Sequence, residues 1–491
     1  MVTMNTVVLV LYLLLTFVIA GWGFKQTSTS EDYWVAGRSL GVAVSVGTYF
    51  ATLISSWSVI GAPGYFYNIG WAGYWQFGGT ILTSVFAALW FGAKIRGTGY
   101  VTLPDILAAR YYSKNVRVIT GGLILIASMM FLTVQTLGAG VILNQITGID
   151  PTIGMIIGVV IFVIFTVTGG MHSVAWTDFA QGVLIFVGVL AAVVIGLVKV
   201  GGFSQMHVQL ATTYPEFLDP FAGGKMGLMM ILNWYVIWGV GNLGTPQFMS
   251  RFLACKDVKV VRLSQGITAI SFALFYFMIG ILGGLAKIIY PGITNADLVG
   301  PTFVTGMLPP LLGAIIMSAL MAAAMSTASS ILLVAATTFA RDFYQTFSKK
   351  QPDDKKLVFM SRTITIVISI ASLGFAMMKL STIFWLQPNM VATMGASVGT
   401  ALVAGFAWKR ANKKGAISSI LSGIIVTTLW FALKLQATTG VHPVIPGTIA
   451  AILAIIVVSL LTEAPPKEVI DEFFPAKSTA NGQEKMQSEA V

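Results

Sequence analysis

Hydrophobic residues fill long stretches of this chain, and short polar segments separate the stretches. Each stretch holds about twenty residues, enough for a helix to cross about 30 Å of hydrocarbon. Apolar residues do not alternate strictly with polar ones, as they would in the strands of a membrane β-barrel. The pattern predicts about thirteen membrane-spanning helices, near residues 4–24, 41–67, 71–93, 118–145, 152–169, 176–200, 227–250, 264–289, 308–338, 359–378, 384–408, 415–435 and 443–462.

The composition agrees with an all-α integral membrane protein. The mean hydropathy is +0.84, 56% of the residues are hydrophobic and 10% are charged. The lone Cys255 excludes an internal disulfide framework. The first apolar stretch lacks a charged region before it and a cleavage site after it, so we expect a retained span and not a signal peptide. The sequence shows no nucleophile–His–acid set, metal cluster or phosphate-binding loop, so we expect no catalytic residues and no enzyme.

The net charge of +11 is distributed as in a membrane protein. If the N-terminus lies outside and the loops alternate, only five of the 29 basic residues fall on external segments: Lys199, Lys225, Lys287, Lys379 and Lys434. Basic residues concentrate in the cytoplasmic loops of membrane proteins. We therefore predict a multi-pass plasma-membrane protein with its N-terminus outside and its C-terminus in the cytoplasm. Its surroundings are membrane lipid, and we expect neither nucleic acid nor an obligate protein partner.

Two predicted spans are interrupted by helix-breaking residues, which lie at 61–64 in the second span and at 239–246 in the seventh. These spans are five apart in chain order and so run in opposite directions. Paired interruptions in two inverted halves are typical of secondary transporters, which bind their cargo at the breaks. We predict a transport domain at 1–463, with inverted repeats near 41–200 (spans 2–6) and 227–408 (spans 7–11). A disordered cytoplasmic tail, 464–491, follows.

The ninth predicted span carries small and hydroxyl-bearing residues on one face, at positions 323, 326, 327 and 330. The face either packs closely against another helix or supplies oxygen ligands to a cation. The interrupted second span adds free carbonyl groups near Ala51 and Ile54. Asp178 lies near the start of the sixth span. Inserting a carboxylate at the centre of a membrane helix costs about 2.5–3.5 kcal/mol. The Asp178 carboxylate is therefore either hydrated or ion-paired at the membrane interface, or it is a ligand of a second cation. The hydroxyl face favours sodium, although protons at Asp178 are an alternative coupling ion.

Several motifs resemble the sodium:solute symporter family, which has a LeuT-type fold. They are residues 31–39 (EDYWVAGRS), the stretch 169–178, Arg251-Phe252 and Met325-Ser326-Thr327. The resemblance implies a five-plus-five inverted repeat with extra N- and C-terminal spans. It implies a first sodium site at Ala51, Ile54, Ala323, Ser326 and Thr327, and a second at Asp178, Ser326, Ser329 and Ser330. One or two sodium ions per cycle are then expected as coupling ions, with no other cofactor.

Local motifs for the solute most resemble sodium/pantothenate symporters, at residues 133–135, 297–302, 308–310 and 442–446. Proline carriers are similar around Trp238 and Pro246, but Asn242 and Gln135 replace aromatic residues of theirs. We expect symport of a small organic solute, foremost a carboxylate such as pantothenate, with proline or a short monocarboxylate as alternatives. A passive channel and a transceptor are alternatives of other classes, but we see no filter-like loop and the tail is short.

No lysine or arginine lies deep in a predicted span, so hydroxyls, amides and freed backbone N–H groups would hold a solute carboxylate. Each candidate side chain could instead make an ordinary hydrogen bond between helices. The candidate substrate residues are Ser55, Ser56, Gln76, Gln135, Trp238 and Asn242.

Overall fold

The structure is a computed structural model that describes residues 4–378 and 383–475. Over these residues the regular elements are helices, and one isolated bridge pairs Leu40 with Cys255. Ten of the described helices are long and apolar enough to cross a membrane. Three shorter apolar helices, Val42–Leu53, Pro151–Val167 and Leu228–Gly244, lie at the predicted second, fifth and seventh spans. The all-α membrane architecture is confirmed, and the count of thirteen spans stays a prediction.

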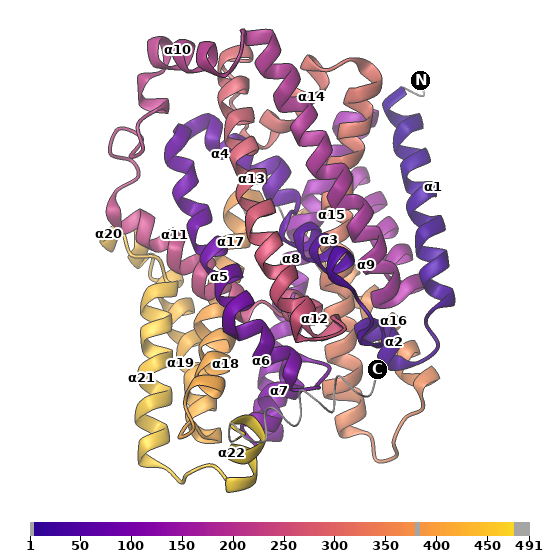
Figure 1. Cartoon of the computed structure of the whole chain (residues 1–491), viewed down its shortest axis with the longest axis vertical. Coiled ribbons are helices and arrows are strands. Elements are labelled where there is room, and N and C mark those ends of the chain that lie inside the picture. Colours follow the sequence, from indigo (N-terminus) through magenta and orange to yellow (C-terminus); the bar gives the residue numbers. More distant parts are fainter. Residues whose placement is uncertain (1–3, 379–382, 476–491) are drawn as a thin grey trace.

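Long helices form most of the bundle in Figure 1. They are α1 (Met4–Lys25), α8 (Lys114–Thr147), α9 (Pro151–Val200), α13 (Val258–Ile289), α15 (Pro310–Thr337), α16 (Asp354–Met377), α19 (Lys413–Ala432) and α21 (Val444–Leu461).

Interrupted spans consist of shorter pieces. These are α3 (Val42–Leu53), α4 (Ala62–Ile69), α5 (Gly78–Phe86), α6 (Gly92–Gly97), α7 (Leu103–Arg110), α11 (Leu228–Gly241), α12 (Pro246–Ala254), α17 (Ile383–Met394) and α18 (Thr400–Ala407). The remaining α-helices are short and connect the spans: α2 (Ser30–Val35), α10 (Phe203–Thr213), α14 (Val299–Met307), α20 (Leu435–Thr439) and α22 (Lys467–Phe473).

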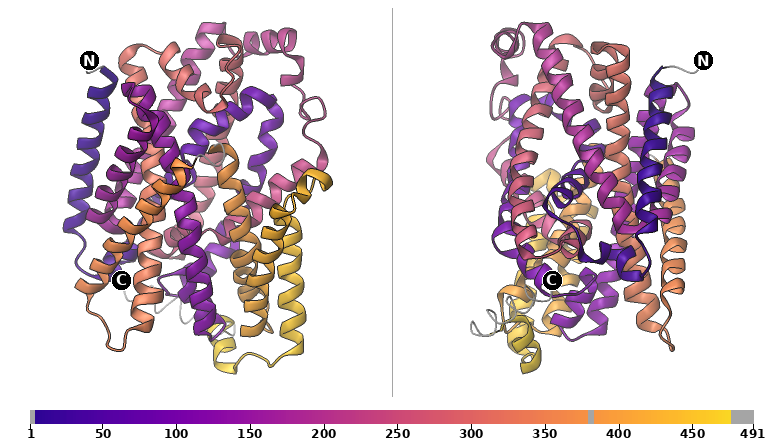
Figure 2. Two further views of the ribbon diagram at one scale, coloured as in Figure 1. Left: turned by 180° about the vertical axis from the view of Figure 1, so that it is seen from behind. Right: turned by 45° about the vertical axis from the view of Figure 1, so that its right-hand side comes forward.

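The helix α15 lies inside the bundle, where it packs against α3, α8, α9 and α16. Its residues from Ser318 to Thr337 are all buried. In contrast, α1 lies at one edge of the bundle and α19 and α21 lie at the opposite edge (Figures 1 and 2). The outward faces of α1 and α21 carry exposed leucine, valine and isoleucine side chains, as expected of surfaces that meet lipid. The sodium-ligand candidates of the ninth span therefore occupy the most enclosed helix.

Both predicted spans are interrupted, and the two breaks have nearly the same backbone geometry. The break in the second span lies at Ile54, before the predicted 61–64, which is helical. The helix α3 ends at Leu53, and Ile54 is extended with φ −87° and ψ 106°. The helix α11 ends at Gly241, and after one short turn Thr245 is extended with φ −85° and ψ 108°. Pro246 then begins α12, where its missing N–H group costs nothing. One extended residue therefore interrupts each span.

A third discontinuity separates the fifth and sixth spans. Gly170 lies within α9 with φ 58° and ψ −164°, a conformation that a side chain would strain. A Cβ atom at this position would also collide with the backbone of Tyr33. The glycine thus allows the chain to turn and brings α2 against α9, with Asp178 two turns beyond.

His442, just before α21, contacts residues of α11 and α17. Its backbone N–H group donates to Asn233 Oδ1 at 2.9 Å, and its Nε2 atom lies 3.2 Å from Asn389 Oδ1. Its Nδ1 atom accepts from the N–H group of Val444 at 3.3 Å, so these contacts require a neutral imidazole. Burial lowers the pKa of His442 to about 4, which keeps the ring neutral at physiological pH.

The polar tail begins with an ordered helix, unlike the disorder predicted from residue 464. Tyr100 donates a hydrogen bond to Glu472 Oε1 at 2.8 Å, and the rings of Phe406 and Phe473 lie 6.0 Å apart. The Arg110 guanidinium lies 5.4 Å from the centre of the Phe474 ring. Phe473 and Phe474 were the missed signal in this polar segment, because each of their rings packs against a residue of the bundle. Residues 476–491 lie outside the described part of the chain.

Candidate functional site

The hydroxyl face of α15 meets the break in the second span. Ser326 Oγ donates to the Ala51 carbonyl at 3.0 Å, and Thr327 Oγ1 lies 3.4 Å from the Ile54 carbonyl. Ser326 Oγ also lies 3.2 Å from the carbonyl oxygen of Ala323. All five side chains or backbone groups are buried. The structure therefore brings together every residue predicted for the first sodium site.

The break makes these carbonyl groups available. In a continuous helix the Ala51 carbonyl would accept from the N–H group of residue 55. Here the Ser55 N–H group donates to Ser58 Oγ instead, at 3.3 Å, so the Ala51 oxygen is free to face α15. Neutral oxygens at such a helix break are the ligands that transporters of this architecture offer to sodium.

The spacing of the oxygens fits a cation of this size. Sodium is nearly as large as calcium, whose oxygen ligands lie about 2.3–2.6 Å away. Two ligands at right angles are then about 3.4 Å apart. Thr327 Oγ1 lies 3.4 Å from the Ile54 carbonyl and 3.5 Å from the Thr52 carbonyl, longer than a normal hydrogen bond. These distances allow an ion to enter with little movement of the helices.

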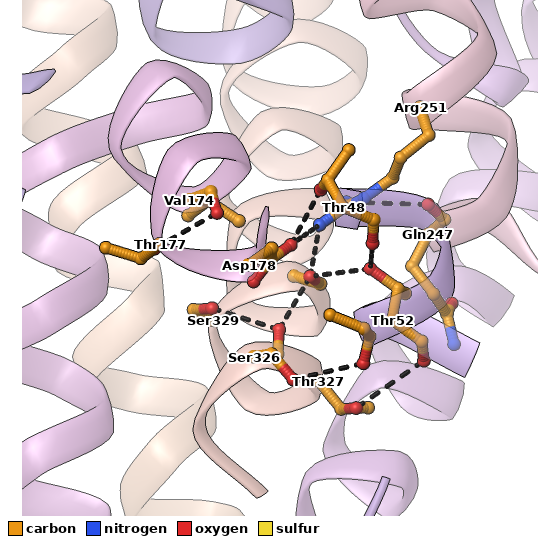
Figure 3. A network of polar contacts seen from close by, with 12 residues as sticks. Thr48, Thr52, Val174, Thr177, Asp178, Gln247, Arg251, Ser326, Thr327 and Ser329 are labelled. Atoms are coloured by element: carbon orange, nitrogen blue, oxygen red, sulfur yellow. Dashed lines mark hydrogen bonds and ion pairs between the residues drawn. The ribbon is translucent and has the colours of Figure 1, made fainter. Parts of the chain in front are cut away.

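Asp178 lies on the neighbouring helix α9 and forms an ion pair with Arg251. Its Oδ2 atom accepts from Thr48 Oγ1 at 2.7 Å and from Arg251 Nη2 at 3.1 Å (Figure 3). The side chains of Asp178 and Arg251 are 0% and 1% exposed, so neither charge is screened by water. Arg251 Nη2 also donates to Ser330 Oγ. Two of the four residues predicted for the second sodium site thus contact a guanidinium group.

The expectation that no basic residue lies deep in the spans is wrong. The predicted seventh span ends at residue 250, which assigns Arg251 to the cytoplasmic loop that follows. The chain instead continues as α12, and the Arg251 side chain of this helix is buried and contacts Ser330 of α15. The other two second-site residues, Ser326 and Ser329, do not contact Arg251: Ser329 Oγ donates to the Ser326 carbonyl at 3.0 Å, and Ser326 Oγ donates to the Ala51 carbonyl at 3.0 Å.

Two further carboxylates, Asp105 and Asp342, are also buried. The ninth span continues past its predicted end at 338 as a helical turn, Thr338–Gln345, that contains buried Asp342. Asp342 accepts from Thr102 Oγ1 at 3.0 Å and lies 3.7 Å from Arg117 Nη1. Arg117 also pairs with Asp105 of α7, so charges link the end of this span to α7 and α8.

A narrow cavity of about 20 Å³ adjoins the first cation site, so it must widen to admit a solute. Aromatic rings form much of its wall: those of Trp57 and Trp238 lie 4.9 Å apart, and those of Phe77 and Tyr276 lie 3.7 Å apart. Thr327 lines both this cavity and the cation site. A solute in the cavity would therefore lie directly beside the ion.

Three predicted substrate residues belong to this cavity or to its wall. Trp238 lines it. Asn242 Nδ2 donates to Oγ1 of Thr80, and Ser55 Oγ donates to Oε1 of Gln387, at 3.2 and 3.1 Å. Thr80 and Gln387 line the cavity, so Asn242 and Ser55 hold its lining residues in place.

The other three candidates lie away from that lining. Gln135 Oε1 accepts from the Ser56 N–H group at 3.1 Å, which fixes the break against α8. The amide atoms of Gln76 are buried without a hydrogen-bond partner among the described residues, as are Gln135 Nε2, Ser56 Oγ, Trp238 Nε1 and Asn242 Oδ1. Buried polar atoms of this kind normally have a partner, so a ligand or water is expected beside them.

Sequence analysis missed most of the cavity lining, including Trp57, Gln247, Tyr276 and Gln387. Two of these residues had a usable signal. Gln247 follows Pro246 in the seventh span, and Gln387 precedes Pro388 inside α17. Amides beside prolines within apolar stretches mark positions where a helix opens and its side chains face a cavity.

Comparisons with known proteins agree on the class of molecule. The high-affinity proline transporter PutP of Bacillus subtilis is 29% identical over 468 residues, covering 93% of this chain and 98% of the relative. The osmoregulated proline transporter OpuE of the same organism is 27% identical over 472 residues, covering 93% and 94%. The sodium/proline symporter of Staphylococcus aureus is 27% identical over 485 residues, covering 94% and 93%. These three relatives do not support the predicted resemblance to pantothenate symporters.

Solved structures confirm the fold. A sodium-coupled sialic acid symporter in a substrate-bound outward-open state matches with a TM-score of 0.83 at 20% identity, covering 94% of this chain and 98% of that one. A closed form of Mhp1, a nucleobase-cation-symport-1 family transporter, matches with a TM-score of 0.62 at 16% identity, covering 90% and 97%. These likenesses confirm the predicted LeuT-type arrangement. A sequence profile of the sodium:solute symporter family matches residues 33–423.

Proposed function

Because the chain belongs to the sodium:solute symporter family, we propose that it uses the sodium gradient to import proline. It is a membrane transporter that couples a solute to sodium, and it is not an enzyme. Three relatives that cover more than nine-tenths of the chain are named as proline transporters. This observation carries the choice of proline over pantothenate and over short monocarboxylates.

The central cavity supports this choice of solute. Its walls carry the rings of Trp57, Phe77, Trp238 and Tyr276, which suit the apolar face of a small ring. Asn242 and Gln135 seemed to favour a more polar solute, but neither lines the cavity. The hydroxyls of Thr52 and Thr327 and the amides of Gln247 and Gln387 are available for the amino and carboxylate groups.

We assign sodium to the first predicted site. An ion there would join the Ala51 and Ile54 carbonyls to Ser326 and Thr327, and so hold the broken span against α15. Because Thr327 also lines the cavity, sodium would order one wall of the solute site before the solute binds. Bound sodium would also lie beside the proline carboxylate and stabilise it. Closure on one side and opening on the other would then carry both inward, with the N-terminus outside as predicted.

The sodium gradient supplies enough free energy. Each inward sodium gains about 2.3 kcal/mol per 100 mV, and a tenfold gradient adds about 1.4 kcal/mol. The sum of about 3.7 kcal/mol supports accumulation of several hundred-fold. Proline is a zwitterion without net charge, so the full voltage term of the sodium ion remains available.

Proteoliposomes containing the purified chain test the proposal. We expect saturable uptake of labelled proline when sodium is imposed outside, and little uptake when choline replaces sodium. Unlabelled proline should compete strongly, whereas pantothenate and lactate should compete weakly. Proline uptake that ignores sodium, or stronger competition by pantothenate, would contradict the proposal. A passive channel would show no counterflow, whereas a carrier exchanges internal for external proline.

A further inference from the structure

The end of the bundle that we assign to the cytoplasm carries an open pocket of about 550 Å³. It lies where α7 leads into α8 and where the ninth span ends, at the end opposite the N-terminus in Figure 1. Among the described residues, its lining contains three basic side chains, Lys114, Arg117 and Arg341, and no carboxylate. A lining of this composition suits an anion with several oxygen acceptors. Hydroxyl and amide groups add further polar atoms to it: Tyr112, Ser113, Gln345, Thr346, Ser348 and Gln351.

One buried carboxylate holds the two arginines beside the pocket. Arg117 Nη2 donates to Asp105 Oδ1, and Arg341 Nε and Nη2 lie 3.3 Å from Asp105 Oδ2. The Asp105 side chain is 2% exposed, whereas those of Arg117 and Arg341 are 19% and 31% exposed. A guanidinium has five N–H donors, so its contact with Asp105 leaves others for a second anion. The arginines are ordered before any ligand arrives, which lowers the entropy cost of binding.

The positive charge of the pocket exceeds the negative charge behind it. The two arginines are balanced by Asp105 and by Asp342, which lies 3.7 Å from Arg117 Nη1. Lys114 is exposed, and it forms no ion pair within the part of the chain that the structure describes. It is the first residue of α8, where the helix dipole adds partial positive charge. A bound anion would therefore meet charge that the protein itself does not neutralise.

The side chains beside the pocket indicate that a lipid supplies the anion. Phe347 is 63% exposed and lies between the lining residues Thr346 and Ser348. Lys349 and Lys350 follow it and are also exposed. An exposed phenylalanine is stabilised among acyl chains, and lysines at a membrane surface are attracted to anionic lipids. A free phosphate ion would use the basic groups but would leave the phenylalanine in water.

We propose that this pocket binds the phosphate group of an anionic phospholipid in the inner leaflet. The phosphate lies among Lys114, Arg117 and Arg341, and the acyl chains lie along Phe347. The first two residues belong to α8, and Arg341 belongs to the turn Thr338–Gln345 at the end of the ninth span. The bound lipid therefore joins two segments that are far apart in the sequence. This site goes beyond the proposed function, because it requires neither the solute nor sodium.

Thermal unfolding of the purified full chain in detergent tests the site. A ligand that binds only the folded protein raises the melting temperature saturably. We expect such a rise with dioctanoyl phosphatidylglycerol, and a much smaller one with inorganic phosphate or with dioctanoyl phosphatidylcholine, whose choline cation cancels the phosphate charge. An equal rise with both lipids would overturn the anionic site. An equal rise with inorganic phosphate at the same concentration would overturn the lipid as the source.

Single variants locate the site. Lys114→Gln and Arg341→Gln should each raise the half-saturating concentration of phosphatidylglycerol about fivefold, because each removes one cation from the headgroup. Lys259→Gln is the matched control and should leave that concentration unchanged: Lys259 is also an exposed lysine in the first turn of a helix, α13, on the side assigned to the cytoplasm, and it does not line the pocket.

The Lys114 variant decides the test even if the Arg341 variant does not fold. Arg341→Gln also removes an ion pair with buried Asp105, whereas Lys114→Gln breaks no ion pair of the described residues. A folded Lys114→Gln protein whose half-saturating phosphatidylglycerol concentration stays within about twofold of the unmodified value would overturn the inference.

Discussion

Replacing Thr327 by alanine removes one hydroxyl that we assign to the sodium ion. Thr327 Oγ1 lies 3.4 Å from the Ile54 carbonyl and 3.5 Å from the Thr52 carbonyl, so the substitution breaks no short hydrogen bond between α15 and α3. The threonine is buried, and alanine is smaller and favours helices. The fold should therefore survive, and the change should act mainly on the ion.

The magnitude follows from the loss of one polar contact to a charge. Such a contact contributes about 1.5–3 kcal/mol when the charged partner is desolvated. Each 1.4 kcal/mol is a factor of ten, so the sodium concentration for half-maximal uptake should rise about 10- to 150-fold. The apparent affinity for proline should fall at low sodium and recover in part at high sodium, because the ion orders the cavity wall that Thr327 shares.

The assay is initial proline uptake by proteoliposomes over a wide range of sodium concentration. Thr327→Ser restores the hydroxyl and should recover most of the sodium affinity. Ser318→Ala is a matched control on α15, because Ser318 Oγ donates to the Ala314 carbonyl of its own helix at 2.9 Å. The reasoning is refuted if Thr327→Ala, folded as judged by gel filtration, keeps its sodium half-saturation within about twofold.

Three further predictions concern packing, pH and the cavity. A Cβ atom at Gly244 would overlap the Met394 carbonyl, so Gly244→Ala should lower thermal stability in detergent by about 1–3 kcal/mol, whereas Gly266→Ala, which meets nothing within 4 Å, should not. The pKa of about 4 at His442 lies below the value of about 6.5 for an unfolded chain, so stability should be full above about pH 6.5 and fall by about 2 kcal/mol at pH 5, and His442→Gln should flatten this dependence in melting curves. Trp238→Ala should raise the proline KM at saturating sodium by about tenfold or more, whereas Trp238→Phe should retain most of the affinity, in the same uptake assay.

The break before Pro246 could be predicted from local residue types, because glycine and proline are poor helix formers. The break in the second span lies at Ile54-Ser55-Ser56, whereas the predicted 61–64 region is helical, so its exact place could not be predicted in this way. The hydroxyl face of α15 was equally visible, because helical periodicity places Ser326 and Thr327 on one side. Its contact with Ala51 and Ile54 followed once both features were assigned to one site.

The ion pair could not be predicted in the same way. Arg251 and Asp178 are 73 positions apart, and hydropathy assigned the arginine to a loop. In the sequence, a charged residue that forms a buried ion pair is flanked by much the same residues as one at the membrane interface. The tertiary packing of α9 and α12 decides which of the two it is. The aromatic cavity wall was missed for a related reason. Trp57 and Tyr276 lie in apolar helices, and hydropathy does not tell which face of a helix meets a cavity.

The two interrupted spans present groups of different kinds to α15. The first break exposes carbonyl groups, which suit a mobile ion that can return to solution. The second break leads into α12, which places Arg251, a charge fixed to the chain, against Asp178 and Ser330. A fixed charge cannot cross the membrane with the solute. In the proposed cycle the ion at the first break therefore draws on the gradient, at about 3.7 kcal/mol per sodium.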